Sequence, residues 1–285
     1  MGQAPELYIP DGFTIKDIVA WGTSGMVFLD STSNTVVKSP LSERDRGTIK
    51  IEREIYERFT QHGGHEGLLQ YVEPFGTGIR LEFASNQGIL PYIRKHKSNI
   101  SFEQRLRWCE ELSCTLFYIH SNKIIHGDLK CNNIFLDGAL HSKVADFGGS
   151  SMDGSGLSVQ VTASHRSPGV LNSIEGDLFA LGSSFYEILT GEAPYAGREE
   201  DEIRSLFSES KFPEATTSLG PMGDIILGCW QGKYVTAHEV YTKIKVIRKR
   251  PDSLYNSPHA LTIATAFVIS GLCLFAVYWK RLASR

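Results

Sequence analysis

The sequence contains little that marks a secreted, zinc-binding or nucleic-acid-binding protein. Its five cysteines, among 285 residues, show neither CxxC nor paired spacing, so we expect free thiols and a reducing compartment. The opening MGQAPELYIP has no basic segment and no apolar run, which argues against a secretory signal. A formal net charge of −3 gives no global attraction to nucleic acid, and we expect no such partner.

Charge is absent from one long segment, residues 260–279, which reads ALTIATAFVISGLCLFAVYW. A helix of this length spans about 30 Å, the thickness of a bilayer core. Tyr278 and Trp279 close the segment, as aromatic residues do at membrane interfaces, and a basic tail, 280–285, follows. We predict a transmembrane tail anchor. The alternative is a buried C-terminal helix of the globular part.

The remaining chain divides into a strand-rich first third and a helical remainder. Residues 13–39 and 68–85 alternate apolar and polar positions like β-hairpins, and 48–60 have a helical period. Helical periods dominate from residue 102 onward. The pattern predicts an α+β protein with two lobes, joined at the polar stretch Ala84–Gly88. The expected organisation is an extension 1–12, a domain 13–250 with lobes 13–83 and 86–250, a linker 251–259, the membrane helix 260–279 and the tail 280–285.

Two segments of the first lobe could contact phosphate groups. In AWGTSGMV, Gly22 and Gly25 lie at the expected tip of a hairpin, where glycines allow backbone N–H groups to approach phosphates. An ordinary turn explains the same spacing. The β-branched strand TVVKS carries Lys38, which could equally be a solvated charge at a sheet edge.

The helix IEREIYERF places a carboxylate on its apolar face. Ile55, Tyr56 and Phe59 define this face, and at about 100° per residue Glu52 lies at its centre while Glu54 lies nearly opposite. A buried carboxylate needs a partner. We therefore expect Glu52 to pair with Lys38. The alternative is an ion pair on the helix surface.

The segments HGDLKCNN and KVADFGG carry the residues for phosphoryl transfer. Asp128 could accept a proton from a substrate hydroxyl, and Lys130 could neutralise charge on the transferred group. Asn133 and Asp146 supply oxygen ligands suited to Mg²⁺. Each motif is weak by itself, but the ordered set of Gly-rich hairpin, strand Lys, helix Glu, D-x-K-x-x-N and D-F-G is specific.

With these motifs, residues 13–250 resemble the eukaryotic protein kinase domain. The resemblance implies a two-lobed fold, with ATP bound between the lobes at a hinge, Glu82–Ala84, that follows Leu81. Lys130 resembles the Ser/Thr-specific branch, and DLFALGS and the short length resemble compact kinases of filamentous fungi. The catalytic residues implied are Lys38, Glu52, Asp128 and Lys130. Those implied for ATP and Mg²⁺ are Ala20, Gly22, Gly25, Val27, Lys38, Glu82, Ala84, Asn133 and Asp146, with Asn133 and Asp146 on the metal.

The chain departs from the kinase pattern at several positions. Ala20 replaces the first glycine of the Gly-rich loop, and Gly127 replaces an Arg that clamps a phosphorylated activation loop in many members. Ser167–Gly169 lacks the usual acidic residue, and the loop CWQGKYVTAHEV lacks the Arg that pairs with it. His165 stands where a Tyr is usual. We predict an active Ser/Thr kinase whose activity is independent of activation-loop phosphorylation. The alternative is a membrane-tethered pseudokinase that acts as a binding module.

The end of the last predicted helix is basic, and the helix dipole alone would also favour cations there. Because the linker 251–259 extends only about 30 Å at most, the kinase domain would lie near the membrane, and these cations would face anionic lipid. ATP use places the domain in the cytosol, on the endoplasmic reticulum or the mitochondrial outer membrane. The protein substrate is not indicated. The basic residues are Lys243, Lys245, Arg248, Lys249 and Arg250.

Overall fold

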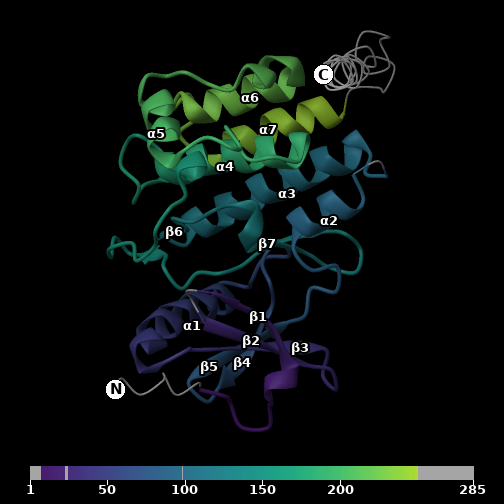
Figure 1. Ribbon diagram of the computed structural model, residues 1–285, viewed down its shortest axis with the longest axis vertical. Coiled ribbons are helices and arrows are strands. Elements are labelled where there is room, and N and C mark those ends of the chain that lie inside the picture. Colours follow the sequence, from purple (N-terminus) through teal and green to yellow (C-terminus); the bar gives the residue numbers. More distant parts are fainter. Residues whose placement is uncertain (1–7, 23–24, 98, 250–285) are drawn as a thin grey trace, which may run out of the picture. The chain divides into compact units, whose positions relative to one another are not determined.

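The computed structural model describes residues 8–22, 25–97 and 99–249 (Figure 1). Met1–Lys245 form one compact unit and Val246–Arg285 a second. The predicted linker, membrane helix and basic tail, residues 251–285, lie outside the described residues. Within the described ranges, no helix is long and apolar enough to cross a membrane.

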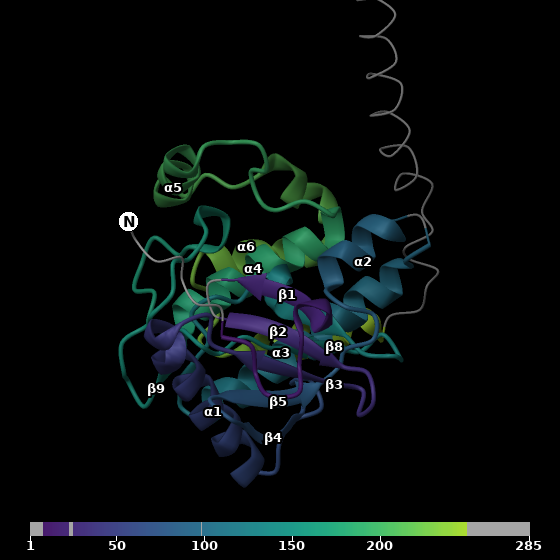
Figure 2. The same cartoon turned by 60° about the horizontal axis from the view of Figure 1, so that its bottom comes forward.

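The first lobe is an antiparallel sheet with one long helix. The strands follow the order β1-β2-β3-β5-β4. Helix α1 packs against β4 and β5 (Figure 2), and its buried residues include Ile55, Tyr56 and Phe59. The bounds are β1 Ile18–Gly22, β2 Gly25–Asp30, β3 Thr35–Ser39, α1 Arg46–Gln61, β4 Tyr71–Phe75 and β5 Gly78–Glu82.

The second lobe is mainly helical. Its helices are α2 Ile89–Lys95, α3 Phe102–Ser121, α4 Ile174–Thr190, α5 Glu200–Ser208, α6 Pro221–Trp230 and α7 Ala237–Arg248. Its short strands are β6 Ile124–Ile125, β7 Ile134–Leu136, β8 Ser142–Val144 and β9 Ser151–Met152, paired as β6 with β9 and β7 with β8.

Helix α4 lies at the centre of the second lobe and packs against α3 and α6. The hydroxyl of Ser173 accepts a hydrogen bond from the N–H of Gly176 and caps its start. Gly191, at φ +87°, ends it in the left-handed region. A Cβ on Gly182 would lie 2.7 Å from the Cβ of Cys229. Only glycine therefore allows α6 to approach α4 this closely.

The structure confirms the predicted α+β class and the two lobes, and it corrects the start of the first hairpin. The first strand begins at Ile18 rather than at residue 13. Thr14 and Asp17 form a capping box, in which the backbone N–H and the hydroxyl of Thr14 both donate to the Asp17 carboxylate. This local bonding stabilises a 3₁₀ turn where the alternation of residue types suggested a strand. The cysteines of the described part are free, namely Cys109, Cys114, Cys131 and Cys229.

Candidate active site

A cleft of about 670 Å³ lies between the sheet and the helical lobe. Apolar side chains from both lobes, including Val36, Leu81 and Leu90, line it together with hinge residues Glu82 to Ala84. Such a mixture of apolar walls and a few polar groups is typical of ligand sites. Every residue that the sequence implies for nucleotide binding lines this cleft, namely Ala20, Gly22, Gly25, Val27, Lys38, Glu82, Ala84, Asn133 and Asp146.

Gly22 and Gly25 of the first hairpin are glycines for different structural reasons. Gly25 has φ +142°, and a Cβ there would lie 2.5 Å from the backbone oxygen of Ser39. Any side chain at this position would separate β2 from β3. In the described part of the chain, nothing lies within 4 Å of a Cβ position on Gly22, so packing against these residues does not require a glycine there. Its place on the wall of the cleft fits close backbone approach by a ligand.

Lys38 pairs with carboxylates from two different segments. Its Nζ lies 2.6 Å from Oε2 of Glu52 on α1 and 2.7 Å from Oδ1 of Asp146. Glu52 is completely buried, whereas Glu54 is half-buried and lies near Lys50. Burial alone would lower the pKa of Lys38, but the charges of Glu52 and Asp146 outweigh it and raise the pKa. Lys38 therefore remains a cation on the wall of the cleft.

Aromatic packing fixes the segment that carries Asp146. The ring of Phe147 is fully buried, with its centroid 5.3 Å from those of Tyr56 and Phe59 and 5.0 Å from that of His126. Asp146 itself has φ +69°, a conformation that turns its side chain toward Lys38 while the next residue enters the core. The Phe147 N–H donates to Oε1 of Glu52 over 3.3 Å.

Asp128, Lys130 and Asn133 form the second polar group of the site. The Nζ of Lys130 lies 2.7 Å from Oδ2 of Asp128. The Asn133 amide N–H donates to the backbone oxygen of Asp128 (2.8 Å) and to its Oδ2 (3.1 Å). Oδ1 of Asp128 is buried and has no hydrogen-bond partner in the described part of the chain. This oxygen is the acceptor that a substrate hydroxyl would satisfy.

Asp177 of α4 holds the loop that carries these residues. Its carboxylate accepts hydrogen bonds from the backbone N–H groups of His126 and Gly127, both at 2.8 Å. His120 contacts the same carboxylate through Nε2 at 3.0 Å. Asp177 is 1% exposed. The central helix of the second lobe thus sets the position of the catalytic loop.

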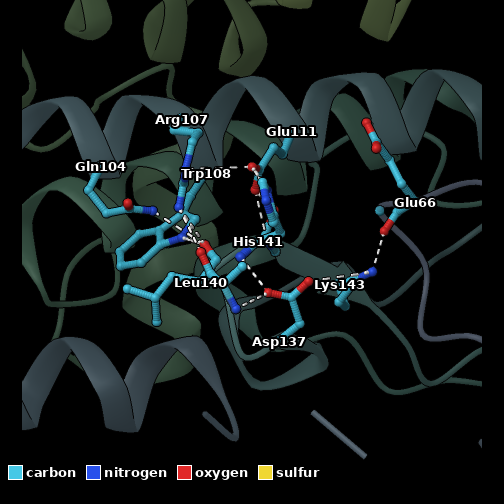
Figure 3. A network of polar contacts seen from close by, with 12 residues as sticks. Glu66, Gln104, Arg107, Trp108, Glu111, Asp137, Leu140, His141 and Lys143 are labelled. Carbon is cyan, nitrogen blue, oxygen red and sulfur yellow. Dashed lines mark hydrogen bonds and ion pairs between the residues drawn. The ribbon is translucent and has the colours of Figure 1, made fainter. Parts of the chain in front are cut away.

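A polar network on α3 holds the hairpin of β7 and β8 (Figure 3). Glu111 accepts hydrogen bonds from the backbone N–H and the hydroxyl of Ser142 and contacts Nδ1 of His141 at 2.8 Å. The indole N–H of Trp108 donates to the backbone oxygen of Leu140 over 2.8 Å. Asn133 directly precedes this hairpin and Asp146 follows it, separated only by Ala145. The network therefore positions both predicted metal ligands.

Lys143 links the same hairpin to the first lobe. Its Nζ donates to the backbone oxygen of Glu66 over 2.6 Å (Figure 3). The same Nζ lies 3.7 Å from Oε1 of the hinge residue Glu82. Sequence patterns did not indicate Lys143 or Glu111 as site-supporting residues. Their partners His141, Ser142 and Glu66 lie at least 30 positions away in the chain, and a local period carries no information on such partners.

At the positions where this chain departs from the kinase pattern, the residues present make contacts with their neighbours. A Cβ on Gly127 would lie 2.4 Å from Cδ2 of Leu157. The hydroxyl of Ser167 accepts a hydrogen bond from the N–H of Gly169, within the segment that lacks the usual acidic residue. His165 is buried, and its Nε2 lies 3.8 Å from Oε2 of Glu187. Burial, aided by the charge of Lys130, lowers the pKa of His165 to about 3.

The residues present fit ATP with Mg²⁺. The Asn133 amide uses its nitrogen as a donor, so its oxygen is the atom suited to a cation. In the described part of the chain no group of three or more His, Cys, Asp or Glu side chains could hold a metal by itself. Asn133 and Asp146 alone make an incomplete ligand set. Such a set is typical of sites where protein and substrate phosphates hold Mg²⁺ jointly.

A cleft with a paired cation, two oxygen ligands for a metal and a carboxylate held beside a lysine defines a nucleotide-dependent phosphotransferase of two-lobed fold. The family described as "Protein kinase domain" matches residues 21–231. The chain belongs to the protein kinase family, and its relatives place it in the serine/threonine class.

Within the aligned segments, similar curated proteins are 25–28% identical to this chain. It is 28% identical to the cell cycle serine/threonine-protein kinase CDC5/MSD2 of Saccharomyces cerevisiae, over 67% of this chain and 27% of that protein. It is 27% identical to the probable serine/threonine-protein kinase gdt2 of Dictyostelium discoideum, over 76% and 14%. It is 25% identical to the serine/threonine-protein kinase STY17 of Arabidopsis thaliana, over 76% and 41%. The match thus covers less than half the length of each relative.

Proposed function

We propose that this chain transfers the γ-phosphoryl group of ATP to serine and threonine hydroxyls of protein substrates. The observation that carries the proposal is the double pairing of Lys38 with Glu52 and Asp146. This pairing joins the strand, the helix and the metal-ligand segment in one arrangement.

Each residue has a defined part in the proposed transfer. The hydroxyl oxygen attacks the γ-phosphorus, the bond to the β–γ bridging oxygen breaks, and the hydroxyl proton passes to Oδ1 of Asp128. Lys130 neutralises charge on the transferred group, and Lys38 holds the non-transferred phosphates. Asn133 and Asp146 would hold Mg²⁺, which supplies charge neutralisation on the phosphate oxygens.

The test is transfer from radiolabelled ATP to a mixture of Ser/Thr peptides by the full-length protein with Mg²⁺. The chain provides a matched pair of variants, since Glu52→Gln changes the buried partner of Lys38 and Glu54→Gln changes the half-buried carboxylate on the opposite face. We expect Glu52→Gln to lose most of the activity and Glu54→Gln to retain it. Asp128→Asn should lose about a hundredfold or more in kcat, the usual contribution of a general base.

The alternative function is a membrane-tethered pseudokinase that binds partners without transferring phosphate. Its support is the set of departures at Gly127, Ser167–Gly169 and His165. Asp146→Asn separates the two functions, because it removes a metal ligand and leaves the side-chain volume nearly unchanged. Equal labelling of substrate by the wild type and Asp146→Asn would favour the pseudokinase.

We further propose that activity does not require a phosphate on the activation segment, residues 146–169. Leu157 lies over Gly127, so an apolar contact occupies the position from which an Arg would reach a phosphate. The buried hydroxyl of Ser150 donates to the backbone oxygen of His126 over 2.8 Å, an arrangement that a phosphate would prevent. Treatment of the purified protein with a phosphatase should leave kcat unchanged. A severalfold loss that autophosphorylation restores would contradict this proposal.

We propose that residues 260–279 anchor the protein in a membrane with the kinase domain in the cytosol. The support is the uncharged sequence itself. The full-length protein should stay with membranes after alkaline carbonate extraction, whereas residues 1–258 should be released. Fractionation then distinguishes the endoplasmic reticulum from the mitochondrial outer membrane, the two destinations that a tail anchor with a basic end allows.

Basic residues close to this segment would add contacts to anionic lipid. On α7, Lys243 and Lys245 are exposed, and each cation near such a surface contributes about 1 kcal/mol. Residues 1–258 should bind vesicles containing phosphatidylserine more strongly than neutral vesicles, and salt should weaken this binding. Lys243→Gln with Lys245→Gln should reduce it. Equal binding to both kinds of vesicle would contradict the electrostatic contact.

A further inference from the structure

One ion pair joins helix α1 directly to the activation segment. The guanidinium of Arg58 donates to both carboxylate oxygens of Asp153, with Nη1 to Oδ1 at 2.9 Å and Nη2 to Oδ2 at 2.6 Å. Arg58 lies near the end of α1, the helix that carries Glu52. Asp153 directly follows β9. Figure 2 shows β9 next to this helix. The bidentate geometry fixes direction as well as distance.

The Asp153 end of the pair is held by backbone bonds. Asp153 has φ +54°, a left-handed conformation that Asp and Asn tolerate better than most residues, and its N–H donates to the backbone oxygen of Lys123 over 3.0 Å. Through β9, Ser151 pairs with Ile125, the residue before His126. The carboxylate is therefore attached to the strand that leads into the catalytic loop.

The Arg58 end contacts the second lobe as well. Its Nη1 also donates to the backbone oxygen of Asn122 over 3.3 Å. The same helix end is joined to α3 by the hydroxyl of Tyr118, which donates to the backbone oxygen of Phe59, and by a contact of His62 with Asn122. These other bonds connect α1 to α3 whatever the activation segment does. Among these polar contacts at the end of α1, only the pair of Arg58 with Asp153 joins α1 to the activation segment.

The other end of α1 also contacts the activation segment. A Cβ on Gly148 would lie 2.5 Å from Cγ2 of Thr48, in the first turn of the helix. Glu52 lies between this contact and Arg58. These two attachments lie on either side of Glu52. Together with the hydrogen bond from the Phe147 N–H to Oε1 of Glu52, they hold α1 where this carboxylate reaches Lys38.

We propose that Arg58 is a positioning residue for phosphoryl transfer, which acts through Asp153. The pair lets the activation segment hold α1 where Glu52 meets Lys38, and it does so with a carboxylate encoded in the sequence, so that no added phosphate is needed. The inference rests on the proposed kinase function and names the contact that would make activity independent of phosphorylation. Neither Arg58 nor Asp153 lines the cleft.

The test is a double-mutant cycle in the full-length protein with Arg58→Gln, Asp153→Asn and both together. Asn preserves the left-handed backbone of Asp153 while removing the charge. We expect each single variant to lower kcat about tenfold, since small misplacements of catalytic groups are costly, with little change in KM for the peptide. The double variant should be no worse than either single one, because both remove the same interaction. Arg58→Lys should restore part of kcat.

Lys50→Gln is the matched control, because it removes a cation of the same helix that pairs with Glu54 within α1. It should retain kcat within about twofold, as distant surface changes do. Effects of Arg58→Gln and Asp153→Asn that add in the double variant, or a kcat for Arg58→Gln equal to that of Lys50→Gln, would overturn the inference. Thermal melts of all variants separate loss of folding from loss of positioning.

Amide hydrogen exchange gives a readout that does not depend on phosphate transfer. Arg58→Gln should accelerate exchange in residues 148–158, and Asp153→Asn should accelerate exchange in α1, whereas Lys50→Gln should do neither. If the wild type transfers no phosphate but this reciprocal exchange occurs, the proposed function fails and the coupling stands. If the wild type is active and the exchange is unchanged, the coupling fails alone.

Discussion

The side chain of Leu157 fills the space that a side chain on Gly127 would need, since a Cβ on Gly127 would lie 2.4 Å from Cδ2 of Leu157. The backbone of Gly127 has φ +76°, which also disfavours other residues. The catalytic loop and the activation segment thus meet through an apolar contact. In the kinase pattern this position carries an Arg, and the contact explains how the segment can pack without one.

We expect Gly127→Ala to lower the free energy of unfolding by about 1–2 kcal/mol, from the left-handed backbone and the contact with Leu157. Adding Leu157→Ala should recover part of this loss, because it removes the clash and leaves only the backbone cost. Urea denaturation of the two single variants and the double variant measures the coupling. Strictly additive effects would show that the two residues do not share this space.

Lys38→Met should affect stability and activity in separable ways. It leaves the fully buried Glu52 without its cation, and removing one member of a buried ion pair typically costs about 3–5 kcal/mol. Lys38→Met combined with Glu52→Leu removes both charges and should restore much of the stability. Activity should remain absent in both, because the phosphates of ATP lose their lysine. Melting temperatures and transfer assays on the same samples check both statements.

The Lys38–Glu52 pair also shows what the sequence could predict. Helical periodicity places Glu52 on the apolar face of α1, and a carboxylate there needs a partner, for which we predict Lys38. The structure has this pair and leaves Glu54 half-buried near Lys50. The two-lobed class was predictable for the same reason, since strand and helix periods are local.

Contacts between distant polar residues were not predictable in this way. Glu111 and Arg58 are ordinary charged positions on amphipathic helices, and their partners lie 31 and 95 positions away. Nothing in the sequence near either residue distinguishes it from a solvated charge. The turn at Thr14–Asp17 was missed for another reason, because side-chain bonds to the backbone there override the alternation of residue types.

Glu111→Gln tests the network that holds the hairpin of β7 and β8. The carboxylate accepts from the backbone and hydroxyl of Ser142 and contacts His141. Hydrogen bonds to a charged group contribute about 1.5–3 kcal/mol in favourable cases, so we expect a loss of about 2 kcal/mol in the free energy of unfolding. Because Asn133 and Asp146 flank the hairpin, the concentration of Mg²⁺ giving half-maximal rate should rise.

Glu110→Gln serves as the control, since it removes the same charge from the adjacent position of α3 and leaves the bonds of Glu111 intact. It should leave the Mg²⁺ requirement unchanged, because the bonds that hold the hairpin of β7 and β8 remain. A normal Mg²⁺ requirement in Glu111→Gln would mean that the hairpin keeps its position without this carboxylate. The network would then contribute to stability only.

Because His165 is buried, we expect the protein to lose stability in mild acid. Burial and the charge of Lys130 lower its pKa to about 3 in the folded protein, whereas an unfolded chain has a histidine pKa near 6.5. Between these values the unfolded state binds a proton that the folded state does not, so stability falls as the pH drops below about 6.5 and the loss ends near pH 3.

The expected loss from His165 alone is about 2 kcal/mol at pH 5 relative to neutral pH. Glu187, which faces the imidazole, has a pKa raised by burial, and protonation of this carboxyl offsets part of the loss. His165→Phe fills a similar volume without a titrating group and keeps Glu187. Its stability should therefore fall less than that of the wild type between pH 7 and pH 5. Denaturation at pH 7 and pH 5 measures the difference, with His238→Gln, which removes an exposed histidine, as the reference. The same change in the free energy of unfolding for all three proteins would contradict a neutral buried His165.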